Sequence, residues 1–216
     1  MPDAAQLAQA HWNETPLFLS EEERYSIYPW LYEAAEFRLH QGEKVLEVGC
    51  GTGSDLLQFA KHGALATGID LTAKHVELAR LRVGDLAVVH QADARHLPLD
   101  DESFDYVYSH GVLHHCDEPE KVVAEMFRVL RPGGRFNVHV YALWSYFSLW
   151  AFLSHGSKWK RRVENSEAIV HIDLYTRRKL RRLFGDDISV QKYQCAPFQF
   201  LAPWFGWFLV VRGQKT

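Results

Sequence analysis

The chain has 216 residues, of which 47% are hydrophobic and 24% charged, a balance typical of a folded domain with a sizeable core. Its 24 Lys and Arg against 27 Asp and Glu give a formal net charge of −3, so it lacks the positive excess that binding to a nucleic-acid backbone requires. The cysteines Cys50, Cys116 and Cys195 are odd in number and show no C-x-x-C spacing. This pattern disfavours a disulfide framework or a structural zinc site and favours a reducing, cytoplasmic compartment.

The N-terminal segment predicts a helical element and no secretory signal. Asp3 precedes every basic residue, and no long apolar core follows it. Apolar side chains recur at near-helical spacing over residues 21–40, and Ser20 with Glu23 forms the pattern of a capping box. We therefore expect a leading helix that is interrupted or kinked at Pro29.

Short apolar runs alternate with helical stretches from residue 44 onward. Such alternation predicts a parallel sheet that is covered by helices on both faces. The expected strands are 44–48, 65–69, 86–90, 104–109 and 135–141, and the expected helices are 56–62, 73–83 and 119–130.

The remainder of the chain departs from this alternation. Residues 142–187 are longer than a crossover needs and rich in aromatic side chains, so we expect a cap insertion over the site. Within it, Thr176 is the expected N-cap of a helix over 177–184 that ends at Gly185. Two final strands are expected over 188–195 and 207–212, joined by a loop over 196–206.

Two stretches, 136–157 and 193–211, contain no Asp, Glu, Lys or Arg, which raises the question of a membrane span. Serine, asparagine and histidine side chains interrupt the first stretch, and Pro197, Pro203 and Gly206 interrupt the second. We therefore expect core strands and aromatic covering segments, with no transmembrane segment. A peripheral contact with a membrane or a lipid-like substrate stays open.

A glycine-rich turn follows the first expected strand, where residues 45–55 read V-L-E-V-G-C-G-T-G-S-D. Alternate glycines let the backbone approach a ligand closely, and a following helix N-terminus supplies amide donors. The dinucleotide fingerprint G-x-G-x-x-G fails because Ser54 stands at the sixth position, and the Walker lysine is absent. A different cofactor is therefore expected on this loop.

The pattern E-x-G-x-G-x-G resembles that of the class I S-adenosylmethionine-dependent methyltransferases, specifically the small-molecule branch with ubiquinone-biosynthesis-type and sugar or natural-product enzymes. Four further motifs carry the resemblance in order: G-I-D-L at 68–71, Q-A-D-A at 91–94, F-D-Y-V-Y-S-H at 104–110 and R-V-L-R-P-G-G at 128–134. It is strong over 45–134 and looser toward both ends.

The resemblance implies a single α/β domain over 1–216, a Rossmann-like three-layer sandwich. Its sheet would have seven mostly parallel strands with the last antiparallel. An N-terminal helical lid (1–41) and an α-helical cap insertion (142–187) would flank a cofactor-binding core (42–141), and the final two strands would follow (188–216).

The resemblance also implies S-adenosyl-L-methionine as cofactor, S-adenosyl-L-homocysteine as product, and no metal. The glycine loop would approach the methionine end, Asp70 the ribose hydroxyls, Asp93 the adenine amino group, and the amide of Ala94 a ring nitrogen. For any single carboxylate, a helix cap or solvated turn is the alternative. The expected cofactor-binding residues are Glu47, Gly49, Cys50, Gly51, Gly53, Asp70, Leu71, Asp93, Ala94, Ser109 and His110.

Methyl transfer to a hydroxyl needs alignment, a dry pocket and a general base. We expect His114 and His115, after the fourth strand, and Tyr141, at the end of the fifth, to act at the acceptor. One histidine of the pair could instead only satisfy backbone groups. His110 and His114 lack a third ligand at a recognised spacing, so no metal site is expected.

The acceptor is expected to be a small molecule, aromatic, sugar or anionic, with O-methylation ahead of N- or C-methylation. The motifs of enzymes that methylate nucleic-acid bases are absent, so no nucleic-acid partner is expected. Residues 158–182 hold nine basic and three acidic side chains, which form either a solvated face or a surface that recruits the acceptor. A nucleotide-dependent oxidoreductase and a catalytically silent S-adenosylmethionine-binding partner protein remain as alternatives, and the chain could be a monomer or a homodimer.

Overall fold

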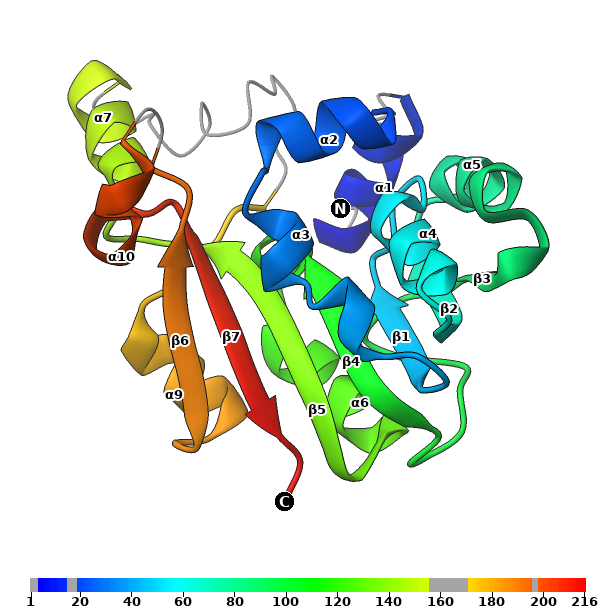
Figure 1. Ribbon diagram of the computed structural model, residues 1–216. Coiled ribbons are helices and arrows are strands. Elements are labelled where there is room, and N and C mark those ends of the chain that lie inside the picture. Colours follow the sequence, from blue (N-terminus) through cyan, green and yellow to red (C-terminus); the bar gives the residue numbers. More distant parts are fainter. Residues whose placement is uncertain (1–3, 15–18, 156–170, 196–197) are drawn as a thin grey trace.

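The computed structural model describes residues 4–14, 19–155, 171–195 and 198–216 (Figure 1). A seven-stranded sheet forms the middle layer in the order β3-β2-β1-β4-β5-β7-β6, and only β7 runs antiparallel to its neighbours. The expected fold class, with the last strand antiparallel, is confirmed. The strands are β1 (Lys44–Val48), β2 (Leu65–Asp70), β3 (Ala87–Gln91), β4 (Phe104–His110), β5 (Leu130–Tyr141), β6 (Ile188–Tyr193) and β7 (Phe208–Gln214).

Helices cover both faces of the sheet. Successive side chains of each strand point to opposite sides, so a strand with consecutive apolar residues has an apolar face on each side for helices to cover. Val45 of β1 packs with α4 (Ser54–Lys61) and α5 (Ala73–Val83) on one face. Leu46 and Val48 pack with α6 (Pro119–Val129) and α9 (Arg177–Phe184) on the other. Strand β1 is therefore buried on both faces, as its apolar residues predicted.

The N-terminal region forms three short helices, α1 (Ala4–Glu14), α2 (Glu21–Ile27) and α3 (Leu31–Ala34). The capping box is confirmed: Ser20 Oγ accepts from the Glu23 amide at 3.1 Å, and Ser20 N donates to Glu23 Oε2 at 2.8 Å. The single helix expected over 21–40 is interrupted where the sequence indicated. Tyr28 leaves the helical region (φ −121°, ψ 64°) because the proline ring that follows disfavours it.

The C-terminal third contains α7 (Tyr146–His155), and the expected helix over 177–184 is confirmed as α9. Thr176 accepts from the Lys179 amide at 3.2 Å, and Gly185 follows the last turn. Strand β6 is shorter than expected because Gln194 adopts a left-handed backbone (φ 61°). The connection expected to be a loop contains η5 (Gln199–Leu201) and α10 (Ala202–Phe205). Within the described ranges no helix is both long and apolar enough to cross a bilayer.

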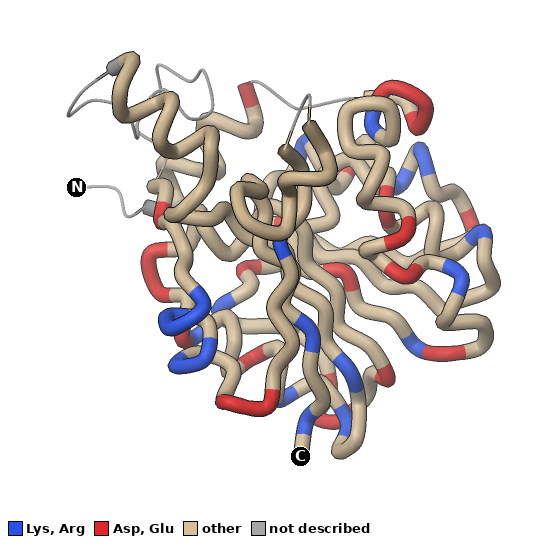
Figure 2. The backbone as a smooth tube through the Cα atoms, turned by 60° about the vertical axis from the view of Figure 1, so that its left-hand side comes forward, with Lys and Arg blue, Asp and Glu red and all other residues tan. Residues whose placement is uncertain are grey.

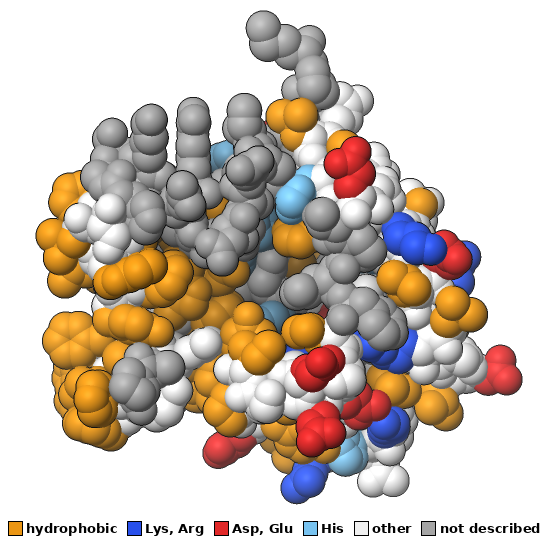
Figure 3. Space-filling view, turned by 90° about the horizontal axis from the view of Figure 1, so that it is seen from above, with side chains coloured by type: hydrophobic (Ala, Val, Ile, Leu, Met, Phe, Trp, Pro, Cys, Tyr) orange, Lys and Arg blue, Asp and Glu red, His pale blue; other side chains and the backbone are white. Residues whose placement is uncertain are grey.

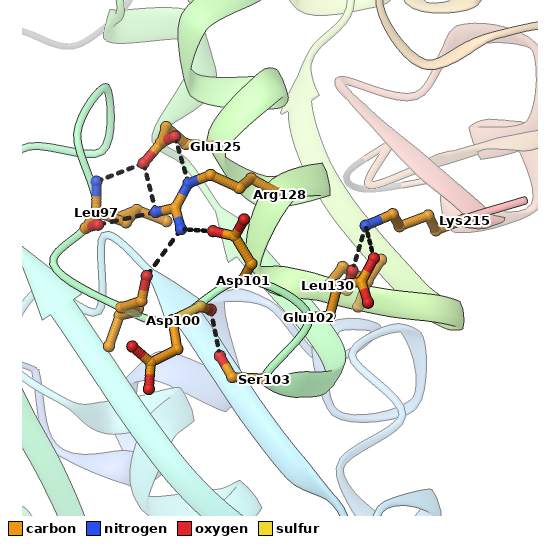
Figure 4. A network of polar contacts seen from close by, with 10 residues as sticks. Leu97, Asp100, Asp101, Glu102, Ser103, Glu125, Arg128, Leu130 and Lys215 are labelled. Atoms are coloured by element: carbon orange, nitrogen blue, oxygen red, sulfur yellow. Dashed lines mark hydrogen bonds and ion pairs between the residues drawn. The ribbon is translucent and has the colours of Figure 1, made fainter.

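Arg128, in one of the sequence motifs, holds the amino end of β4 in place (Figure 4). Its guanidinium donates to the carbonyls of Leu97 at 2.9 Å and Leu99 at 2.8 Å and to Asp101 at 2.6 Å. Glu125, one turn earlier on α6, accepts from it as well. This network clamps the connection between β3 and β4 onto α6, so the motif serves the fold at the end of β4 opposite His110.

Candidate functional site

A cavity of about 890 Å³ opens at the carboxyl ends of β1, β2 and β4. In an open α/β sheet this is where ligands bind, because the chain leaves β1 toward one side and returns to β4 on the other. Residues of α1 and α2, Tyr141 at the end of β5, and Tyr146 and Phe147 of α7 complete its wall. Figure 3 looks down onto this end of the molecule.

The glycine loop forms the floor of the cavity. Gly49 has φ 73°, and a Cβ there would lie 2.2 Å from Val112 Cγ2, so only glycine fits. Gly51 has φ 52°, and nothing lies within 4 Å of a Cβ built on it. The loop backbone is therefore open to a ligand at Gly51.

Asp70 ties the loop to the end of β2. Its Oδ2 accepts from the Gly51 amide at 2.8 Å, and its Oδ1 accepts from the Thr72 amide at 2.9 Å and lies 3.3 Å from His75 Nδ1. A carboxylate has about four lone-pair sites, so further donors can still bind. Asp70 lines the cavity, and both its oxygens already organise the loop.

A buried ion pair joins α2 to α4 beside the loop. Arg24 donates to the two oxygens of Asp55 at 2.7 and 2.6 Å, and the hydroxyls of Tyr25 and Tyr108 each donate to Asp55 at 3.0 Å. Burial by itself would raise the pKa of Asp55, but the Arg24 charge and these hydrogen bonds outweigh it and lower the pKa. Asp55 is therefore ionised and fully paired.

Glu47 is the contrasting carboxylate. Its side chain, at the end of β1, is buried and lines the cavity, and its Oε2 has no hydrogen-bond partner. Burial raises the pKa of Glu47 well above its ordinary value, and the charges of Asp55 and Asp70 raise it further, against the influence of Arg24. A buried carboxylate oxygen without a donor is costly, so this position suits a cationic ligand group.

The cavity wall as a whole is acidic. Asp93 makes a bidentate pair with Arg95 Nε and Nη2 at distances of 2.8 to 3.1 Å, and Arg95 also reaches Glu118 at 3.1 Å. Burial opposes ionisation of Asp93, but the hydrogen bonds from Arg95 lower its pKa. Among the described residues, the lining holds five carboxylates against two guanidinium groups: Glu47, Asp55, Asp70, Asp93 and Asp117 against Arg24 and Arg95.

A chain of hydrogen bonds fixes the tautomer of His110. Asn137 Nδ2 donates to the Ala34 carbonyl at 2.7 Å, so its Oδ1 accepts from Nε2 of His139 at 2.9 Å. Burial lowers the pKa of His139 and of His110, so both rings are neutral near pH 7. Nδ1 of His139 then accepts from Nδ1 of His110 at 2.9 Å. Nε2 of His110, on a ring that lines the cavity, is left as an acceptor.

Aromatic rings form the wall opposite the acidic residues. The His110 ring stacks on Phe208 with centroids 5.1 Å apart, and Tyr141 stacks on Trp207 at 4.4 Å. Phe147 packs against Trp207 at 4.7 Å. The cavity therefore has an acidic half at the glycine loop and an aromatic half near α7, with His110 between them.

The structure brings most of the predicted site residues into one cavity. Three do not line it: Gly53 precedes α4 with its amide donating to the Cys50 carbonyl, Ser109 Oγ donates to the Val48 carbonyl at 2.9 Å, and His114 is buried against Tyr141 at 3.7 Å. The predicted residues that line it are Glu47, Gly49, Cys50, Gly51, Asp70, Leu71, Asp93, Ala94, His110, His115 and Tyr141.

The sequence reasoning missed several lining residues. Asp55 lies directly behind the glycine loop, and a charged side chain there could have been identified as part of the site. Arg24 follows three glutamates in the first turn of α2. Nothing local in the sequence indicates that it pairs with Asp55, 31 positions away. The missed lining residues from the N-terminal region are Ala8, Gln9, His11, Trp12, Leu19, Arg24 and Tyr28.

Two expectations concern charge and metal. The basic residues Lys158, Lys160, Arg161 and Arg162 of the expected cap lie outside the described residues. Among the residues that the structure does describe, no group of three or more His, Cys, Asp or Glu is arranged to hold a metal ion.

Comparisons with known proteins agree with this geometry. Residues 46–138 match the model of a family described as a methyltransferase domain. The 27-O-demethylrifamycin SV methyltransferase of Amycolatopsis mediterranei (strain S699) is 40% identical over 103 residues, covering 45% of this chain and 38% of that protein. Methyltransferase GfsG of Streptomyces halstedii is 40% identical over 114 residues, covering 50% of this chain and 40% of that protein.

The chain thus spans about two fifths of the length of these curated relatives. Among solved structures, a SAM-dependent methyltransferase from Thermotoga maritima superposes with a TM-score of 0.69 at 21% identity, covering 96% of this chain and 99% of that one. This likeness shows a shared fold over almost the whole chain.

Proposed function

We propose that the chain, whose residues 46–138 match a methyltransferase domain, belongs to the class I S-adenosylmethionine-dependent methyltransferases and transfers the methyl group of S-adenosyl-L-methionine to a small-molecule acceptor. The observation that carries the proposal is Glu47. Its buried Oε2 has no hydrogen-bond partner and faces an acidic cavity at the glycine loop. A cationic ligand group there would supply the missing donor and favour the ionised form of Glu47.

The charge of the cavity supports this cofactor over a dinucleotide. S-adenosyl-L-methionine carries an ammonium and a sulfonium against one carboxylate, so it is cationic overall. Five lining carboxylates against two guanidinium groups complement such a ligand. The diphosphate of a dinucleotide is anionic and would need the opposite balance.

Different lining residues bind different parts of the cofactor. In this proposal Glu47 binds the ammonium, and the open backbone at Gly51 accommodates the methionine end. Asp70 accepts from the ribose hydroxyls in addition to holding the loop, and Asp93 with the Ala94 amide binds the adenine. When bound, the cofactor supplies an activated methyl group with a neutral leaving group.

The acceptor would occupy the aromatic half, and His110 is the proposed general base. Its Nε2 is unprotonated because the chain through His139 and Asn137 places the proton on Nδ1. For a hydroxyl acceptor, His110 Nε2 takes the hydroxyl proton as the oxygen attacks the methyl carbon. His115 also lines the cavity, with Nδ1 donating to the His171 carbonyl at 3.0 Å, and His114 would only support Tyr141.

O-methylation is supported by this base and by the name of the rifamycin relative, whose acceptor is an oxygen. N- and C-methylation remain the alternatives that the same cavity could serve.

Calorimetric titration of the purified chain with S-adenosyl-L-homocysteine, S-adenosyl-L-methionine and NADH tests the cofactor without knowledge of the acceptor. We expect heat from the two sulfur compounds and none from NADH. Folded protein that binds neither sulfur compound would refute the proposal.

The base is tested with His110→Gln on the first hydroxyl acceptor that supports turnover. General acid–base catalysis contributes about 10²- to 10⁴-fold, so kcat should fall by that order while binding of S-adenosyl-L-homocysteine stays unchanged. The same loss in His115→Gln, with His110→Gln fully active, would transfer the role to His115.

A further inference from the structure

Helix α7 has the reverse of the amphipathic arrangement that is usual in a water-soluble protein. Its inward side is small and polar: Ser148 and Ala151 are buried, and Ser148 Oγ donates to the Ala142 carbonyl at 2.9 Å. Its outward side is apolar, with Leu153 74% exposed. A helix that presents large apolar side chains outward is typical of an apolar environment. The exposed apolar residues of α7 are Leu149, Trp150, Phe152 and Leu153.

A second apolar element lies beside it. Phe200 of η5 and Trp204 of α10 are 73% and 65% exposed. Lys192 Nζ bridges the two elements, because it donates to the carbonyls of Trp144 and Trp204. Figures 1 and 3 show α7 next to α10 and hydrophobic side chains gathered over this side of the molecule. We call this the aromatic surface: Trp144, Leu149, Trp150, Phe152, Leu153, Phe198, Phe200, Trp204 and Phe205.

The charges at this surface are one-sided. The sequences of α7 and α10 contain no charged residue, and their tubes carry no red or blue (Figure 2). Lys192 lies at the junction, and Arg177 is near enough to lower its pKa further after burial has done so. No carboxylate of the described residues acts on Lys192. An apolar surface whose nearest charges are the cations Lys192 and Arg177 complements an anionic bilayer.

We propose that the aromatic surface docks this chain on the interface of a membrane that contains anionic lipids. Tryptophan and phenylalanine side chains partition into the boundary between headgroups and acyl chains, and the charge of Lys192 adds attraction to the headgroups. This docking proposal does not depend on the proposed methyl transfer.

The surface is continuous with the mouth of the cavity. Tyr146 and Phe147 of α7 line the cavity, and Trp207, two residues after α10, packs against Phe147. An apolar acceptor dissolved in the bilayer would therefore enter the aromatic half of the cavity without crossing water.

A second copy of the chain fits the surface less well. Protein interfaces carry roughly one hydrogen bond per 100–200 Å² and a polar rim. Here the hydroxyls of Ser145 and Ser148 are buried and bonded to each other at 2.9 Å, so α7 turns them away from a partner.

The test is flotation of the full chain with vesicles of phosphatidylcholine alone or of equal parts phosphatidylcholine and phosphatidylglycerol. We expect binding that is stronger to the mixed vesicles. Leu153→Asp should lower the ratio of bound to free protein by about tenfold or more, because a charge replaces an inserted apolar side chain. The matched control is Leu81→Asp on α5, where the leucine is 76% exposed but lies away from the surface.

Both variants are checked by thermal unfolding and by titration with S-adenosyl-L-homocysteine, which the substitutions should leave unchanged. Phe200→Asp repeats the comparison from the other element if Leu153→Asp does not fold. Equal loss in the Leu81 control, or no flotation of the parent chain, overturns the proposal. A dimer that Leu153→Asp dissociates, without vesicle binding, would assign the surface to a second copy.

Discussion

Replacing Glu47 with glutamine should make the protein more stable and its cofactor site weaker at the same time. The Glu47 carboxyl group is buried with one oxygen unpartnered, and burial raises its pKa well above the ordinary value. An unsatisfied buried polar group costs about 1–3 kcal/mol. Glu47→Gln should therefore raise the free energy of unfolding at pH 8 by about 1–3 kcal/mol. A charge-assisted hydrogen bond contributes about 1.5–3 kcal/mol, so affinity for S-adenosyl-L-homocysteine should fall roughly ten- to a hundredfold.

The higher free energy of unfolding expected for Glu47→Gln should depend on pH. The pKa of Glu47 is higher in the folded than in the unfolded chain, so the folded protein loses stability relative to the unfolded chain once the pH exceeds the ordinary carboxyl pKa. Stability contributed by the protonated form is complete below the ordinary carboxyl pKa and is lost as the pH rises through the folded pKa. Urea unfolding of parent and variant should therefore differ at pH 8 and converge toward pH 4.

Asp55→Asn is the control variant, for which we expect the opposite change in stability. Asp55 is equally buried, but Arg24, Tyr25 and Tyr108 all bond to it. Its loss leaves Arg24 buried without its carboxylate, which should destabilise the fold by about 3–5 kcal/mol. A Glu47→Gln variant that is less stable than the parent, or that binds the cofactor unchanged, would refute the reasoning about the orphaned oxygen.

Three further predictions concern the loop, its acidic neighbour and the buried histidines. Asp70→Ala should weaken S-adenosyl-L-homocysteine binding at least about tenfold in calorimetry, since a charge-assisted partner is lost; unchanged affinity would mean that the ribose lies elsewhere. Gly51→Ala and Gly42→Ala both place a side chain at positive φ, each costing about 1–2 kcal/mol in urea unfolding, but only the first should abolish ligand binding, because only Gly51 lines the cavity. Because burial lowers the pKa of His110 and His139, stability present above about pH 6.5 should be lost as the pH falls toward their folded pKa values, by up to about 1.4 kcal/mol per pH unit for each histidine. Urea unfolding of the parent protein and of His110→Gln measures this slope. A free energy of unfolding of the parent that stays constant from pH 7 to 5 would contradict the prediction.

Local sequence patterns predicted a parallel sheet covered on both faces and located the acidic half of the cavity, whereas the seven strands with the last antiparallel were implied by the family resemblance. The apolar runs fixed the strands because a doubly covered parallel sheet needs apolar residues on both faces. The glycine loop and Asp70 could be located because a backbone that turns sharply behind a strand requires glycine, whatever the rest of the chain does. The capping box of Ser20 and Glu23 is equally local, since its partners lie within one turn.

Only the tertiary structure decided which side chains share the cavity and in what state. Arg24 reaches Asp55 across 31 positions, and His110 meets His139 across 29, on neighbouring strands. Such distances depend on packing, which sequence spacing does not encode. The structure likewise turned His114 away from the cavity. It also turned the apolar side of α7 outward, where the polar residues that interrupt this uncharged stretch had favoured a covering segment, because burial depends on which surfaces the rest of the chain covers.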